Sequence, residues 1–136
     1  MQHLKQEGWI RALGISSKTL AGGLAAVDLC DAVMIVHNRD YTEEEAVIAK
    51  SVQQGTAVLL KKVLASGHIC HDAPPVSAET RKAAELLDQN QEQDPIQSAL
   101  NFAYAQPGVT SAVIGTVNLQ HLHANLIKAL RAQKLA

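Results

Sequence analysis

A glycine placed between an apolar run and a helix start is the strongest chemical signal in the sequence. The segment at 114–118, IGTVN, leaves an apolar run, turns at Gly115 and enters a helix capped by Asn118. Glycine lets a backbone approach a ligand closely, and the free N–H groups of a helix N-terminus favour a phosphate. Most turns of this kind bind nothing, so the turn alone indicates a phosphate site only weakly.

Three further pairs of polar residues follow apolar runs in the same way. They are Ser16-Ser17, His37-Asn38 and Lys61-Lys62. In parallel α/β proteins ligands bind at the carboxyl ends of the strands. If the apolar runs are parallel strands, these three pairs and Gly115-Thr116 meet at one rim and form the candidate site.

The rim also offers an alternative acid/base site, in which Lys61 and Lys62 act with His37 and Tyr41. Placement in a crevice without a shifted pKa is weak support for catalysis. We therefore favour the simpler interpretation, in which one lysine faces a phosphate or solvent and the other caps a strand.

We predict no metal site. The segment at 68–72, HICHD, holds metal-binding residue types, but its spacing in a proline-rich loop fits no standard zinc pattern. His121 and His123 lie two apart on a predicted helix and point in different directions. Cys30, near a helix end, is expected to be an inert small apolar residue.

The elements that position these residues alternate between short apolar runs and amphipathic segments. We predict strands at 9–16, 32–36, 56–60 and 111–114, the middle two buried on both faces. Helices are predicted at 1–7, 19–29, 42–54, from Asp94 to before Pro107, and from Asn118 onward. Leu20, Leu24 and Val27 share one face of the helix predicted at 19–29. The leucine stripe of the last helix is expected to be core or to belong to the helix layer of a barrel, and it comprises Leu119, Leu122, Leu126 and Leu130.

This alternation predicts parallel βα repeats in a single domain, 1–136. Residues 65–93 interrupt it as a long loop with a helix at 77–88. Hydrophobic residues make up 47% of the chain and only four are aromatic, a mixture that suits helices packed on parallel strands.

Charge and cysteine content narrow the classes of partner and compartment. The net charge of −1 arises from 12 basic and 13 acidic side chains, which gives no general attraction to nucleic acid or anionic membrane. Two cysteines cannot form a disulfide framework, and no segment is typical of a signal peptide or a membrane span. We therefore expect a cytoplasmic chain.

Four parallel strands form either an open sheet or half of a (β/α)8 TIM barrel, and a whole barrel needs about 250 residues. Half a barrel has bare edge strands, and such edges pair with something. We expect another chain, a second copy or a rearranged sheet to cover them.

Several stretches, in order along nearly the whole chain, resemble the aldo-keto reductases, which are NAD(P)H-dependent carbonyl reductases with a (β/α)8 fold. They are 8–17 (GWIRALGISS), 31–38 (DAVMIVHN), 55–67 (GTAVLLKKVLASG) and 99–125, which ends in QPGVTSAVIGTVNLQHLHAN. The resemblance places the chain on barrel strands five to eight, the half that supplies much of the cofactor site.

The resemblance implies a set of residues that contact NADPH or NADH. Ser16 matches a serine at the nicotinamide amide, while Ser17, Met34 and Lys61 stand where the family usually has Asn, Gln and often Tyr. At the adenosine end the matches are Gly115, Thr116 and Val117 in the phosphate turn, His121 where many members have Arg, and Asn125 beside adenine. These departures leave fewer side chains suited to hold the nicotinamide amide. His121 leaves the choice between NADP and NAD open, because Arg binds a 2′-phosphate more strongly than neutral His does.

The family's catalytic Asp, Tyr, Lys and His lie on the first four strands, which this resemblance leaves out. We therefore assign no catalytic residue and expect no carbonyl reduction by the chain alone. Three hypotheses follow: a truncated or split reductase that needs an N-terminal half-barrel chain, a non-catalytic half-barrel that self-associates as a homodimer, or a fragment without a separate function.

Overall fold

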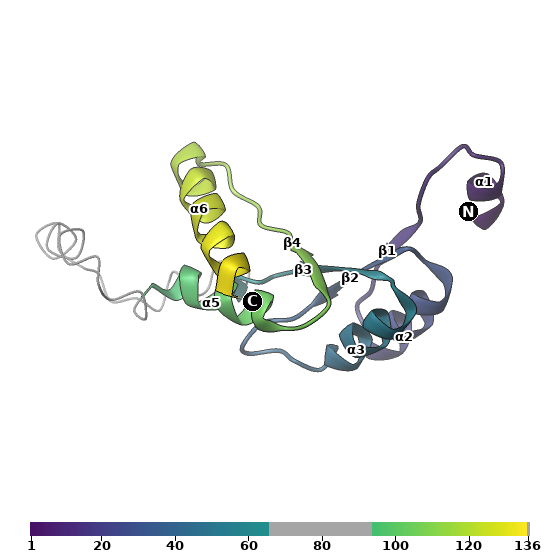
Figure 1. Ribbon diagram of the computed structural model, residues 1–136, viewed down its shortest axis with the longest axis horizontal. Helices are drawn as coiled ribbons and strands as arrows, with labels where there is room; N and C mark the ends of the chain where they lie inside the picture. Colours follow the sequence, from purple (N-terminus) through teal and green to yellow (C-terminus); the bar gives the residue numbers. More distant parts are fainter. Residues whose placement is uncertain (66–93, 136) are drawn as a thin grey trace, which may run out of the picture.

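The computed structural model, which describes residues 1–65 and 94–135, is a four-stranded parallel sheet with helices between the strands (Figure 1). The elements are α1 (Gln2–Gln6), β1 (Gly14–Ser16), α2 (Leu20–Leu29), β2 (Ala32–Val36), α3 (Glu45–Gln54), β3 (Ala57–Lys61), α5 (Pro95–Ala105), β4 (Val109–Ala112) and α6 (Leu119–Leu135). The strand order is β1-β2-β3-β4, with every neighbouring pair parallel. The predicted parallel βα repeats are confirmed. The predicted helix at 77–88, and all of the 65–93 loop except Ala65, lie outside the described residues.

The helices pack in two pairs, α2 against α3 and α5 against α6. In Figure 1, α1 and α6 lie towards opposite ends of the molecule. Gly23 allows the first pair to approach closely, because a Cβ atom there would stand 2.7 Å from Cγ2 of Val47.

Only one face of the sheet is fully covered. Val33, Ile35, Val58 and Leu60 are buried on the face that packs against the helices. Their neighbours along β2 and β3, which point to the opposite face, are only half-buried, and they include Met34, Val36, Leu59 and Lys61. The prediction of strands buried on both faces is wrong for this chain, because nothing among the described residues fully covers the second face.

Two strands differ from their predicted bounds because pairing, and not apolar composition, sets where a strand begins. β1 starts at Gly14 instead of residue 9, since its register begins opposite Ala32, the first residue of β2. β4 covers Val109–Ala112 instead of 111–114. The Thr110 hydroxyl accepts the Val58 N–H at 3.0 Å, beside an irregularity in the β3–β4 register, and so joins the pairing early.

Helix starts follow side-chain capping where a cap forms. Thr19 accepts the Gly22 N–H, and Asp94 accepts the N–H groups of Ile96 and Gln97. These two starts are confirmed. The helix predicted at 42–54 begins later than expected: α3 starts at Glu45, and no side chain caps it.

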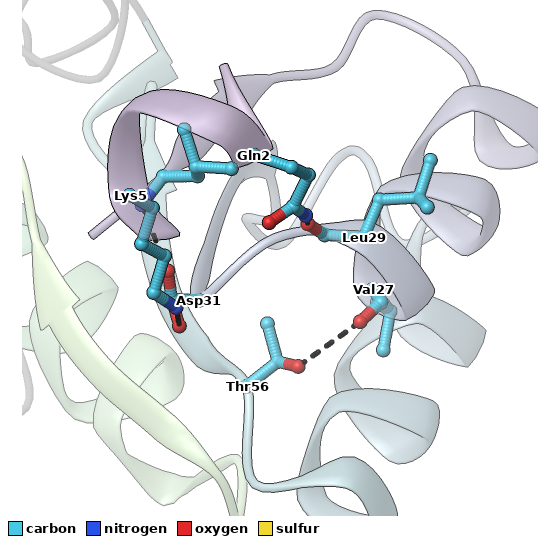
Figure 2. A network of polar contacts seen from close by, with 7 residues as sticks. Gln2, Lys5, Val27, Leu29, Asp31 and Thr56 are labelled. Carbon is cyan, nitrogen blue, oxygen red and sulfur yellow. Dashed lines mark hydrogen bonds and ion pairs between the residues drawn. The ribbon is translucent and has the colours of Figure 1, made fainter. Parts of the chain in front are cut away.

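Polar contacts at the amino ends of the strands tie α1 and the helix–strand connections together (Figure 2). Asp31 accepts from the Lys5 ammonium and from the Leu13 N–H, and Thr56 donates to the Val27 carbonyl at 3.2 Å. The hydrogen bond from Lys5, followed by that from Leu13, lowers the pKa of Asp31. This end of the sheet, opposite the candidate site, serves the fold.

The apolar stripe of α6 is not core within this chain. Leu119, Leu122, Leu126 and Leu130 are each more than half exposed. α6 packs on α5 through a different face, which includes Ala129 and Ala132. Of the two roles predicted for this stripe, core and the helix layer of a barrel, the core role is wrong within the described residues. Leu20 on α2 is also exposed, whereas Leu24 and Val27 join the core.

Within residues 1–65 and 94–135, no helix has the length and apolar character needed to cross a bilayer.

Asp94 joins α5 to α6, which makes it a test of how the second helix pair is held. It caps α5 and pairs with the Lys128 ammonium at 2.5 Å. Burial raises its pKa, but the bonds from Lys128 and from the Gln97 and Ile96 N–H groups outweigh burial, so its pKa lies below 3.8. Because the folded pKa is lowered, its stabilisation is present above the unfolded value and is lost as pH falls through the folded value.

We expect Asp94→Ala to lower the free energy of unfolding at neutral pH by about 1–2 kcal/mol, from the lost cap and ion pair. Asp94→Asn keeps the capping oxygen and should lose less than about 1 kcal/mol. Urea unfolding across pH measures both variants. The gap between wild type and Asp94→Asn should close as pH falls below 3.8, and a gap independent of pH would contradict this role.

Candidate functional site

The carboxyl ends of β1 and β3 are joined by one side chain, Lys61. Its Nζ donates to the Ser16 hydroxyl oxygen at 2.8 Å and to the Ser17 carbonyl oxygen at 2.5 Å. Since β2 lies between these strands, the Lys61 side chain crosses it on the half-buried face of the sheet, the inner face. Ser16, Ser17 and Lys61, three of the predicted site residues, are therefore brought together.

The side chains of Ser17 and Met34 contribute less to this end of the rim. The Ser17 hydroxyl donates to the Thr19 carbonyl at 2.7 Å and accepts the Thr19 N–H, so its hydrogen bonds are made within the turn into α2. Met34 lies beside Ser16 in the strand register, on the half-covered inner face. Ser17 thus supports the turn through its side chain, while Ser16 and Met34 face the open side.

The end of β2 is held by polar contacts of two kinds. A Glu44 carboxylate oxygen accepts the Val36 N–H at 2.7 Å, where β1 is too short to supply a partner. The Asn38 amide donates to the Lys62 carbonyl at 2.9 Å and so links the ends of β2 and β3. Lys62 has a positive φ of 57°, an uncommon backbone conformation for a lysine. Side-chain hydrogen bonds therefore hold the strand ends together at this rim.

His37 does not take part in an acid/base group with the lysines. Its ring is buried and stacks on Phe102 of α5, with ring centroids 5.2 Å apart. Burial lowers its pKa, although the charge of Glu45 opposes the shift. Among the described residues Lys61 contacts Ser16 and Ser17, and no hydrogen bond joins it to His37 or Tyr41. A bond with Glu43 raises the pKa of Tyr41. The arrangement favours the interpretation in which the two lysines do not form an acid/base site with His37 and Tyr41.

The turn between β4 and α6 exposes unused backbone donors. Gly115, Thr116 and Val117 are exposed, and their N–H groups make no hydrogen bond to any other described residue. The space beside Gly115 is open, since a Cβ there would meet nothing within 4 Å. Asn118 caps α6 as predicted by accepting the Gln120 and His121 N–H groups. A ligand at this turn would therefore meet the N–H groups that precede the cap.

The last two predicted site residues lie on the first turns of α6. His121 is exposed and Asn125 is buried. β1 and β4 are opposite edges of the sheet, so Ser16 and Gly115 belong to separate ends of the rim. The predicted residues form two groups, one at the ends of β1 and β3 and one at the start of α6.

No group of three or more His, Cys, Asp or Glu residues able to hold a metal ion is found in the part of the chain that the structure describes. The segment at 68–72 that was weighed as a zinc site, with Cys70, lies outside the described residues. Cys30 is a partly buried free thiol.

Two contacts at the rim were missed by sequence reasoning. The Lys61–Ser16 bond joins residues 45 positions apart, a separation that local patterns do not register. Glu44 was placed inside the predicted helix at 42–54, whereas it lies just before α3 and its carboxylate accepts the Val36 N–H of β2. Its place just before a helix and eight residues beyond Val36 was the only available signal.

Comparison with known proteins agrees with this architecture. The sequence model of the Aldo/keto reductase family matches residues 1–134. The chain belongs to the aldo/keto reductase family. No curated protein gave a significant match.

Two solved structures show how much of the family fold is present. An aldo-keto reductase from Pseudomonas aeruginosa is 31% identical and superposes with a TM-score of 0.73 over 96% of this chain. An aldo-keto reductase from Bacillus halodurans, in its holo form, is 20% identical with the same TM-score of 0.73 over 99% of this chain. The chain covers only 42% and 53% of these two proteins. It is therefore a partial (β/α)8 barrel of about half the relatives' length.

The burial of His37 predicts a pH-dependent stability. Because its folded pKa is lowered from 6.5, the unfolded chain binds the proton more readily, and stability falls as pH drops below 6.5 towards the folded value. His37→Phe keeps a ring against Phe102 and removes the titration. Urea unfolding between weakly acidic and neutral pH should show a smaller loss for the variant, and equal losses in both proteins would contradict the assignment.

Proposed function

We propose that the chain is the C-terminal half of an aldo-keto reductase barrel that binds NAD(P)H and reduces carbonyl groups only when the missing half is supplied. The observation that carries the proposal is the exposed turn from Gly115 to Val117, whose N–H groups bond to no other described residue, in a chain whose family match runs over residues 1–134. Unused N–H groups beside an open glycine suit a phosphate oxygen.

The described residues fit a dinucleotide at both ends of the rim. Gly115, Thr116 and Val117 would hold a phosphate through their N–H groups, and His121 and Asn125 would face the adenosine portion. Ser16, Met34 and Lys61 would border the nicotinamide, with Ser17 supporting through the turn. NAD(P)H would supply the hydride, while the residues of this chain bind and orient it.

Carbonyl reduction needs more than the cofactor, because a proton must reach the carbonyl oxygen. The resemblance places the family's Asp, Tyr, Lys and His in the half that this chain does not match. We assign no catalytic residue here, and activity depends on strands that another segment provides.

The surfaces left open in this chain suit that segment. β1 and β4 are the outer strands of the sheet, the inner face is half-covered, and the α6 leucine stripe is exposed. A half-barrel with four strand–helix units would pair with both edges and cover the apolar residues together. The relatives are about twice as long as the part covered here, which favours the missing half-barrel over a second copy of this chain as the partner of these surfaces.

NADPH binding tests the proposal directly. Nicotinamide fluorescence should show saturable binding to the purified chain. Gly115→Val should weaken binding by about tenfold, because its side chain would occupy the space of the phosphate. The open surroundings of Gly115 mean that the substitution should leave the fold intact.

Ala46→Val is the matched control, since it adds similar bulk on the exposed surface of α3. It should bind NADPH as tightly as wild type. Equal binding by wild type and Gly115→Val would remove the turn from the site, and absence of binding in a folded wild-type chain would refute the cofactor proposal.

His121→Arg tests the adenosine end. An arginine offers a permanent charge and paired donors to a 2′-phosphate, whereas neutral histidine does not. We expect the NADPH-over-NADH preference to rise by about tenfold in the variant. Parallel titrations with both dinucleotides measure it, and an unchanged ratio would show that His121 does not face the 2′ position.

A further inference from the structure

Among residues 1–65 and 94–135, no acid pairs with Lys61. Within that part of the chain its Nζ bonds to the Ser16 hydroxyl and the Ser17 carbonyl, both neutral. The ion pairs of residues 1–65 and 94–135 use His3, Lys5, Lys50 and Lys128 as their basic partners. Lys61 is also partly buried. A partly dehydrated cation without a counter-charge attracts an anion more strongly than a solvated surface lysine does.

Lys61 and Ser16 each keep a hydrogen-bond donor that the described contacts leave unused. A lysine ammonium has three N–H donors, and Lys61 uses two of them. Because the Ser16 oxygen accepts from Lys61, its own hydrogen is left to donate. The Ser17 hydroxyl is already used by Thr19. Lys61 and Ser16 therefore present two donors side by side.

A pair of donors with a net positive charge selects among ligand groups. A carboxylate or phosphate offers only acceptor oxygens and a negative charge, so both donors are satisfied. A neutral carboxamide, such as that of nicotinamide, carries no charge and so offsets the Lys61 charge less well, although its NH₂ group can donate to the second lone pair of the Ser16 oxygen. The charge of Lys61 therefore favours an oxyanion over a carboxamide.

We propose that Lys61 and Ser16 form an oxyanion subsite at the carboxyl ends of β3 and β1, which takes a carboxylate or phosphate group. The subsite lies on the half-covered inner face, where Met34 supplies an apolar neighbour between the two strands. It does not require the chain to bind NAD(P)H. The oxyanion belongs either to a phosphate of the cofactor or to the carboxylate of a second small molecule.

The test uses amide NMR of the full chain, titrated with acetate, inorganic phosphate and acetamide. Acetate and acetamide share a shape and differ in charge and in donor content. The amides of Ser16, Ser17 and Lys61 should shift saturably with acetate and phosphate, and acetamide should bind much more weakly, because it does not offset the Lys61 charge. Equal responses to acetate and acetamide would overturn the proposal.

Lys61→Met removes the charge and keeps the length of the side chain, and Lys62→Met is the matched control on the exposed neighbour. Lys61→Met should weaken acetate binding by about tenfold or more, as expected for a bond to a charged group. Lys62→Met should stay within about twofold of wild type. Unchanged binding in Lys61→Met, with unshifted core amides such as those of Val33 and Leu60, would refute the subsite.

Ser16→Ala provides a second variant if Lys61→Met fails to fold. It keeps the ammonium and removes one donor, so binding should weaken by about fivefold. Wild-type affinity for acetate would count against the paired donors and overturn the subsite as proposed.

A last titration separates the two sources of the oxyanion. If a cofactor phosphate fills the subsite, NADPH competes with acetate and Lys61→Met weakens NADPH binding. If a second molecule fills it, acetate binds the NADPH-loaded chain and Lys61→Met leaves the NADPH affinity unchanged. A chain that binds acetate but no NADPH would retain the subsite and lose only the proposed cofactor function.

Discussion

Backbone pairing between parallel strands is the constraint on which the rest of this structure depends. The four strands pair in the order of the sequence, so β1 and β4 stay at the outside and each has one unpaired edge. The same arrangement covers the sheet with helices on one face and leaves the other half-covered. In a closed barrel both edges disappear and the inner face becomes core. The family match and the covered share of the relatives agree with a partial barrel.

The two ends of the sheet have different tasks. At the amino ends, Asp31 and Thr56 form hydrogen bonds that join α1, α2 and the strands. At the carboxyl ends, Lys61 and Asn38 link neighbouring strand ends, yet the Lys61 charge and the N–H groups of the Gly115 turn remain without partners in the described residues. The unpaired charge and the unused N–H groups at the carboxyl ends of the strands are the physical basis of the proposed site.

Sequence reasoning located β2 and the starts of α2 and α5, because a short β-branched run and capping side chains are local signals. It placed β1 and β4 less well, since their limits depend on partners far along the chain. The α6 stripe was expected in the core because its period is that of a covered helix, but no element within residues 1–65 and 94–135 covers it. The candidate rim followed from the strand pattern, whereas the Lys61–Ser16 bond depended on curvature and reach, which no local pattern encodes.

The central claim, that the chain is a cofactor-binding half whose chemistry requires the other half, is tested most directly by carbonyl-dependent NADPH oxidation. The assay compares the purified chain with the chain co-expressed with the remaining strand–helix units of the Pseudomonas aeruginosa relative. The account predicts no turnover by the chain alone and turnover that appears with the co-purified assembly. Turnover by the chain alone, or a folded assembly that binds NADPH and reduces no carbonyl compound, would contradict it.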